Sequence, residues 1–176
     1  MKQDVVIRPA SRDDFDQLIT LFESVADERL WIGTEPGFDQ RAYRAGWADV
    51  VDGKGGALFV AAEGDCLVGT LGIRHSSNHG CELGMLVKMS HRGRGVGSAL
   101  VTEAIQWARQ RGEPSLSLLV FPHNAAAIAL YKRFGFEERR RYERFKKRQN
   151  GDVWDVILMV RPLAGRRDDN QEAAAH

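Results

Sequence analysis

The segment ELGMLVKMSHRGRGVG, residues 82–97, passes from an apolar run to a glycine-rich run. Residues 81–88 are mostly apolar and predict a strand. After the glycines, apolar residues recur at i, i+4 and i+8 from Val96 to Ala108, which predicts a long helix. The free N–H groups and the positive dipole end at a helix start favour an anion. This strand–loop–helix segment therefore predicts an anion-binding site.

The loop Arg92–Gly97 has glycines at alternate positions, and these allow a phosphate to approach the backbone closely. Its two arginines are expected to add charge-assisted hydrogen bonds. A glycine-rich connection that only permits a tight turn is the alternative. Two other phosphate motifs fit badly: a P-loop needs Lys and then Ser or Thr after its last glycine, and a dinucleotide fingerprint needs a glycine where Ser98 stands.

Periodicity and turn residues predict the remaining elements on both sides of this segment. Strands are expected at 5–7, 57–63, 66–74, 116–121, 136–145 and 153–160. Helices are expected after a capping box at Ser11 and Asp14, from 39 to about 51, and over 124–134. The strand at 116–121 should lie parallel to the strand at 81–88, because a helix joins them.

Two signatures in this order resemble those of the GNAT superfamily of N-acetyltransferases. The first is Glu82–Val87 followed by R-x-x-G-x-G over Arg92–Gly97, and the second is N-x-x-A-x-x-L-Y-x-x-x-G-F over Asn124–Phe136. The resemblance covers residues 5–163. It implies an α+β fold, in which a mixed, mostly antiparallel seven-stranded sheet is flanked by four helices and splayed between strands 4 and 5. We expect one domain over 1–163 and a polar, disordered tail over 164–176.

The resemblance implies acetyl-CoA as co-substrate, with its pantetheine arm in the splay and its pyrophosphate on the glycine loop. The amides of the arm would pair with the open edge of the fourth strand, and the backbone N–H of Leu86 would face the thioester oxygen. The residues expected to contact the cofactor are Met85, Leu86, Val87, Arg92, Gly93, Arg94, Gly95, Val96, Gly97, Ser98, Asn124 and Tyr131.

Two side chains are candidates for proton transfer. An amine is mostly protonated at neutral pH, so its attack on a thioester needs a base, and Glu82 is our candidate, acting directly or through water. An exposed carboxylate paired with a neighbour is the alternative for this residue. Tyr131 lies two turns after Asn124 and is expected to serve the departing thiolate. A tyrosine that only packs between helix and sheet is the alternative there.

The expected function is transfer of acetyl from acetyl-CoA to a primary amine of a small molecule or peptide, by direct attack. Residues 33–38 and the closing hairpin are expected to form the acceptor pocket. A catalytically silent acyl-CoA-binding regulatory module is the alternative, and the presence of both Glu82 and Tyr131 favours the enzyme.

Charge and composition argue against several partners. Lys plus Arg number 25 against 24 Asp plus Glu, so no overall field steers the chain to nucleic acid or to a membrane. The basic run 139–148 is interpreted as a solvated hairpin face. No apolar segment approaches the roughly 20 residues of a membrane span, and the first residues do not resemble a signal peptide. The cytoplasm is the expected compartment, and a homodimer is left open.

The cysteines and histidines do not predict a metal centre. Cys66 and Cys81 lie in predicted strands and show no spaced framework. His75, His79 and Cys81 cluster around one turn but lack a fourth ligand. We therefore expect no metal cofactor.

Overall fold

The apolar runs of the chain form one seven-stranded sheet in the computed structural model, which describes residues 4–76 and 80–163. The strands are β1 (Val5–Pro9), β2 (Ala57–Glu63), β3 (Cys66–Ser76), β4 (Gly80–Val87), β5 (Ser115–Val120), β6 (Glu137–Lys147) and β7 (Val153–Pro162). Their order across the sheet is β1-β2-β3-β4-β5-β7-β6. Among the strands of the described residues, only β4 and β5 pair in parallel, so the predicted mixed, mostly antiparallel sheet is confirmed.

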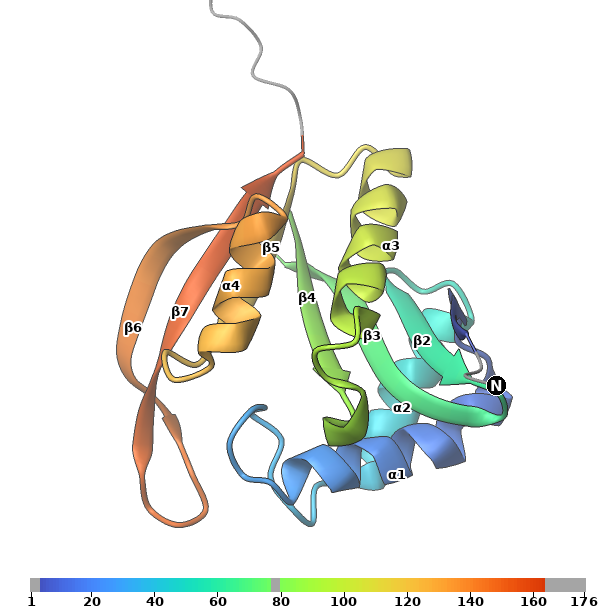
Figure 1. The fold of residues 1–176 in the computed structure, drawn as a ribbon, viewed down its shortest axis with the longest axis horizontal. Helices are drawn as coiled ribbons and strands as arrows, with labels where there is room; N and C mark the ends of the chain where they lie inside the picture. Colours follow the sequence, from blue (N-terminus) through green and yellow to red (C-terminus); the bar gives the residue numbers. More distant parts are fainter. Residues whose placement is uncertain (1–3, 77–79, 164–176) are drawn as a thin grey trace, which may run out of the picture.

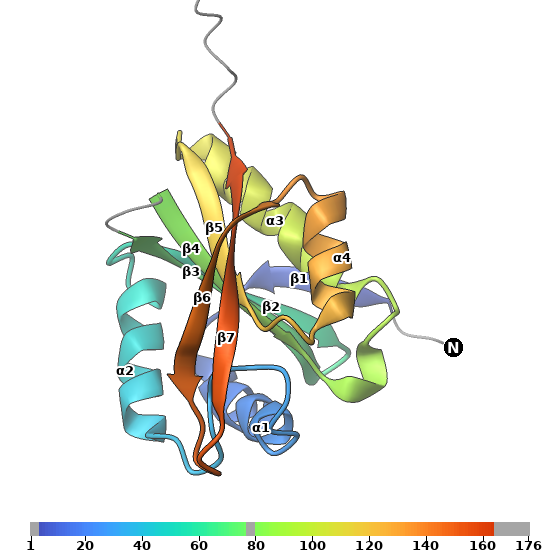
Figure 2. The same cartoon turned by 90° about the vertical axis from the view of Figure 1, so that its left-hand side faces the viewer.

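Four α-helices of the described residues cover both faces of the sheet. They are α1 (Phe15–Ala26), α2 (Gln40–Val51), α3 (Val96–Gln110) and α4 (Ala125–Arg133). α1 and α2 lie on one face, and α3 and α4 lie on the other (Figures 1 and 2). The predicted capping box is present ahead of α1, where the Ser11 N–H donates to the Asp14 carboxylate at 2.7 Å.

Two buried clusters hold these layers together. On the α3 side, Leu71, Leu100 and Leu116 are fully buried. On the side of α1 and α2, Leu18 and Val60 are fully buried. Because apolar side chains are buried on both faces, β2 is a continuous apolar run with five consecutive buried residues.

The parallel pair β4–β5 separates soon after it begins. Only Cys81 with Leu116 and Glu82 with Ser117 are in register, although β4 continues to Val87. Beyond these pairs the two strands diverge, with α4 beside the gap (Figure 1). The predicted splay between strands 4 and 5 is thus confirmed, and the rest of β4 has an edge that no strand covers on the β5 side.

The expected disordered tail, residues 164–176, lies outside the described residues. None of the helices within the described ranges is long and apolar enough to cross a membrane.

Candidate active site

A large cavity of about 1480 Å³ runs through the splay. Its walls come from β4, the glycine loop, α4, the segment between α1 and α2, and the β6–β7 hairpin. The predicted site residues that line it are Glu82, Met85, Leu86, Val87, Arg92, Gly93, Gly95, Gly97, Ser98, Asn124 and Tyr131. Arg94 and Val96 do not line it: Val96 is buried in the core, and Arg94 pairs with Glu63.

The glycine loop is shaped by residues in the left-handed region. Gly93 has a φ of 71° and Gly95, the residue before α3, has a φ of 88°. The Ala99 N–H donates to the Gly95 carbonyl at 3.0 Å. The N–H groups of residues 96–98 precede this bond and have no acceptor within the helix. They lie at the positive end of the α3 dipole beside the cavity, which suits an anion.

Arg92 is held by a carboxylate that the sequence analysis did not identify. Its guanidinium donates to both oxygens of Glu28 at 2.7 and 2.6 Å, and its Nε donates to the Val87 carbonyl at 3.0 Å. Glu28 also accepts from the Trp31 indole at 2.7 Å. The hydrogen bonds from Arg92, and secondarily that from Trp31, hold the pKa of Glu28 below its usual range despite partial burial. This network joins the glycine loop to the segment after α1.

Arg94 makes a looser contact of the same kind. Its guanidinium donates to Glu63 at 3.1 Å, and the other oxygen of Glu63 lies 2.9 Å from His91 Nε2. The hydrogen bond with His91, together with the charge of Arg94, lowers the pKa of Glu63. Both arginines of the loop thus have carboxylate partners, so a phosphate contact from either one stays a prediction.

Glu82 lies on the face of the sheet that carries α1 and α2, opposite the face of its neighbour Leu83. Arg74, its cross-strand partner, donates to one carboxylate oxygen at 2.8 Å, which leaves the other oxygen for a substrate. Beside this pair, Gly72 and Gly84 also face each other, and a Cβ at Gly84 would meet no atom within 4 Å. Open space therefore lies next to the Glu82 carboxylate.

Tyr131 combines a packing role with a position on the cavity. Its ring meets Phe136 edge-on with centroids 5.7 Å apart, and the residue is 6% exposed. Burial raises the pKa of its phenol, so the hydroxyl keeps its proton and is a hydrogen-bond donor. Asn124 caps the same helix by accepting from the Ala127 N–H at 3.2 Å, which leaves its NH₂ group for a ligand.

An aromatic wall on the α1–α2 side was missed by the sequence analysis. Phe22, Tyr43 and Trp47 lie with ring centroids 5.2 to 5.8 Å apart, and all three line the cavity. The Tyr43 hydroxyl lies 2.7 Å from the Thr34 hydroxyl. The i, i+4 spacing of Tyr43 and Trp47 on a helix is the one signal that could have identified this wall.

The interpretation of 139–148 as a solvated face is wrong for Arg148, which is 4% exposed. Its Nε donates to Glu35 at 2.8 Å, and its guanidinium lies 4.3 Å from the Trp154 ring centroid. Long-range partners on a loop far away in the chain satisfy this charge, and they tie the β6–β7 hairpin to residues 29–36. Most of the other cations of the run are exposed, as expected.

Residues 18–136 match the model of the Acetyltransferase (GNAT) family. The chain belongs to this family. An uncharacterized N-acetyltransferase of Methanocaldococcus jannaschii, MJ1207, is 46% identical over 55 residues, which are 31% of this chain and 24% of that protein. The L-amino acid N-acetyltransferase AaaT of Escherichia coli is 35% identical over 112 residues, 59% of this chain and 66% of that protein. Each match thus spans less than two thirds of the relative.

The fold of this GNAT chain is shared with solved structures. The putative acetyltransferase yncA from Salmonella typhimurium, solved with its cofactor acetyl-CoA, superposes with a TM-score of 0.81 at 21% identity, over 93% of this chain and 96% of that chain. The resemblance predicted from the two signatures is confirmed. In three dimensions these signatures lie on β4 with its glycine loop and on α4, the two sides of the splay.

Proposed function

We propose that this GNAT chain is an N-acetyltransferase that moves acetyl from acetyl-CoA to a primary amine by direct attack. The supporting observation is that one continuous cavity extends from the glycine loop through the splay to Glu82 on the opposite face of the sheet. A thioester placed in the gap between β4 and β5 would be reached by the cofactor from the α3–α4 side and by the amine from the α1–α2 side.

Backbone groups of the chain would hold the cofactor. The N–H groups at the start of α3 would bind the pyrophosphate, and the open edge of β4 over Met85–Val87 would pair with the pantetheine amides. The Leu86 N–H would donate to the thioester oxygen as charge develops on it. The acetyl-CoA in the Salmonella structure supports this choice of co-substrate.

The reaction needs several proton movements in this proposal. Glu82 takes a proton from the ammonium, directly or through water, and the nitrogen lone pair then attacks the thioester carbon. The attack leaves the nitrogen positively charged, and it loses its second proton to water. The tetrahedral intermediate then collapses by breaking the C–S bond, and the bonding pair leaves with sulfur. The raised pKa of Tyr131 suits a phenol that donates a hydrogen bond to this sulfur while it is negative.

The cavity suggests amino-acid-like acceptors. Cationic Arg74 and Lys146 line it together with the aromatic wall, so an acceptor carboxylate and an apolar side chain would both find partners. The name of the relative AaaT, an L-amino acid N-acetyltransferase, points in the same direction. L-amino acids are therefore the acceptors that we propose to test first.

The test is release of free thiol from acetyl-CoA with a panel of L-amino acids, their carboxamides and short peptides. We expect release that depends on the amine and is faster with the free carboxylate than with the carboxamide. Equal rates for acid and amide would contradict the acceptor class. Stabilisation by acetyl-CoA without thiol release for any amine would instead identify the silent regulatory module.

The cytoplasm as the compartment stays a prediction from composition, and so does the absence of nucleic-acid and membrane partners. The same holds for the domain limits, and a homodimer stays open.

A further inference from the structure

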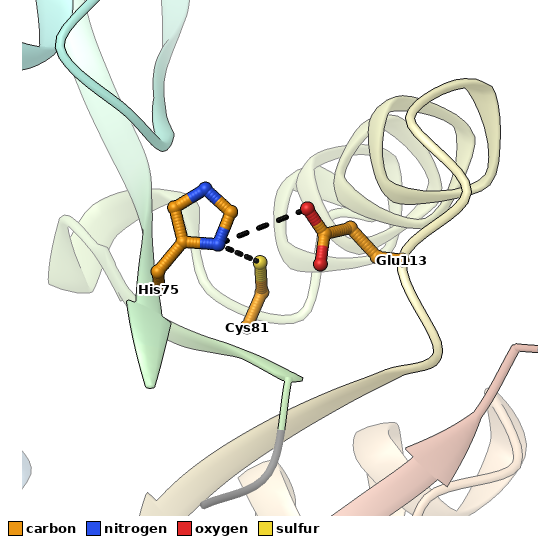
Figure 3. Close-up of side chains that lie close together, drawn as sticks. All are labelled: His75, Cys81 and Glu113. Atoms are coloured by element: carbon orange, nitrogen blue, oxygen red, sulfur yellow. Dashed lines mark hydrogen bonds and ion pairs between the residues drawn. The ribbon is translucent and has the colours of Figure 1, made fainter. Parts of the chain in front are cut away.

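A second cluster of reactive side chains lies away from the cavity, at the end where β4 and β5 still pair. His75 near the end of β3 and Cys81 near the start of β4 are direct cross-strand partners. Glu113, from the connection between α3 and β5, points at both of them (Figure 3). His79, which the sequence analysis considered with this group, lies outside the described residues. Glu113 is the member that local spacing could not reveal.

The three atoms that could bind a metal ion lie close together. Cys81 Sγ lies 3.5 Å from His75 Nδ1, which lies 3.8 Å from Glu113 Oε1, and all three atoms lie within 4.8 Å of one another. Metal–ligand bonds of 2.0 to 2.3 Å at tetrahedral angles place sulfur and nitrogen roughly 3.6 Å apart, and nitrogen and oxygen roughly 3.4 Å apart. The sulfur–nitrogen and nitrogen–oxygen pairs are therefore within about 0.4 Å of the spacing of ligands on a tetrahedral Zn²⁺, and the sulfur and oxygen lie within 4.8 Å of each other. Three ligands would leave one position for water.

The surroundings keep these atoms in place. The pairing of β3 with β4 holds the side chains of His75 and Cys81 on one face of the sheet. Glu113 is held by its N–H, which donates to the Ala108 carbonyl at 3.0 Å, after Gly112 turns the chain with a φ of 69°. Cys81 is fully buried and Glu113 is partly buried, with its side chain 14% exposed, whereas His75 is exposed, so an ion would enter past the imidazole.

The same residues are poorly suited to covalent catalysis. Burial, together with the Glu113 carboxylate, raises the pKa of the Cys81 thiol to about 12. A nucleophilic cysteine needs an accessible sulfur and a lowered pKa. A cation that displaces the thiol proton changes this balance, because thiolate and carboxylate together supply the two negative charges that offset M²⁺.

We propose that His75, Cys81 and Glu113 form a binding site for a divalent cation of the Zn²⁺ class. Imidazole and thiolate select such ions over Mg²⁺ or Ca²⁺. Cys81 is also one of the two β4 residues that pair with β5. A bound ion would therefore fasten β3, β4 and the α3–β5 connection at the closed end of the splay, beside the backbone of Glu82.

The test is a zinc titration against a chromophoric chelator, with Co²⁺ as a spectroscopic probe. We expect one zinc per chain, a thiolate-to-cobalt charge-transfer band in the near ultraviolet, and a zinc-dependent rise in melting temperature. Cys81→Ser and His75→Ala should weaken zinc binding by at least tenfold, and Glu113→Gln by less. Cys66→Ser is the matched control, since Cys66 is exposed and outside the cluster, and it should bind as the parent does.

Two results would overturn the proposal. One is cobalt binding to the parent protein without a charge-transfer band. This measurement needs no variant, so the misfolding of a variant cannot explain its result. The other is equal zinc affinity for the parent and for Cys81→Ser or His75→Ala variants whose circular dichroism shows them to be folded. In either case the three side chains would form only a hydrogen-bonded group.

Discussion

Tyr131 illustrates how one residue can pack and still be available for chemistry. Its ring is buried against Phe136 while the residue also lines the cavity. Tyr131→Phe keeps the ring and removes only the hydroxyl. We expect turnover to fall by roughly tenfold or more, with melting temperature and CoA affinity nearly unchanged. A loss of stability with unchanged turnover per folded molecule would show that the tyrosine is structural and that the thiolate leaves without its help.

Glu82 is the second residue whose role depends on its setting. Arg74 occupies one carboxylate oxygen, and the other stays available beside the open space over Gly84. Glu82→Gln should lower turnover by about 10² or more near pH 7. The loss should shrink as pH rises, because more of the amine is then already neutral. A parent-like rate with a parent-like pH profile would exclude Glu82 as the base.

At the scale of elements, the glycine loop depends on its left-handed residues. In Gly95→Ala, a Cβ is added at a φ of 88°, where it points into the open space proposed for phosphate. We expect about 1 kcal/mol lower stability and at least tenfold weaker CoA binding by calorimetry. Gly151→Ala, with a φ of 91° in the β6–β7 turn, is the matched control. It should lose similar stability and keep its CoA affinity, so equal CoA affinities for both variants would remove the loop from the site.

The glycine loop is also fixed by a residue outside it, because Glu28 accepts hydrogen bonds from the Arg92 guanidinium. The pKa of Glu28 is depressed in the fold, so the stability it contributes is present above its ordinary value of about 4.3 and is lost as pH falls through the folded-state value. Glu28→Gln should lower the free energy of unfolding by roughly 1 to 2 kcal/mol at pH 7. Denaturation at several pH values should show this difference shrinking in acid. The exposed Glu143→Gln is the control and should follow the parent at every pH.

At the scale of the whole molecule, the sheet has two parts, and β4 and β5 join them through two residue pairs. A cofactor that spans the gap would bind the folded chain only, since the contacts proposed for it would come from β4, the α3 start and α4. Acetyl-CoA at about 100 times its dissociation constant should therefore stabilise the protein by about 2.7 kcal/mol. Thermal denaturation measures this, with ATP as the control that shares a phosphate chain and lacks the pantetheine arm. Equal stabilisation by ATP would limit the site to phosphate binding.

Much of the fold could be predicted from the sequence because its signals are local. Strands and helices follow from the spacing of apolar residues over one or two turns, and the glycine loop and Asn124–Phe136 are contiguous motifs. Predicting the splay required the family resemblance. The structure then located the splay by showing where β4 and β5 stop pairing. Confirmed predictions of this kind all depend on residues that are neighbours along the chain or on a short motif.

The partners of the charged groups were decided in three dimensions. Glu28 and Arg92 are 64 positions apart, and the Arg148 side chain donates to the Ile32 carbonyl across 116 positions. Glu113 likewise reaches His75 and Cys81 only because α3 folds back over the β3–β4 ladder. A charge has no periodic pattern that identifies its partner, and its burial becomes favourable only once that partner is in place. Packing of distant segments therefore determined which cations face solvent, which carboxylate pairs with Arg92 of the glycine loop and which side chains lie beside Cys81.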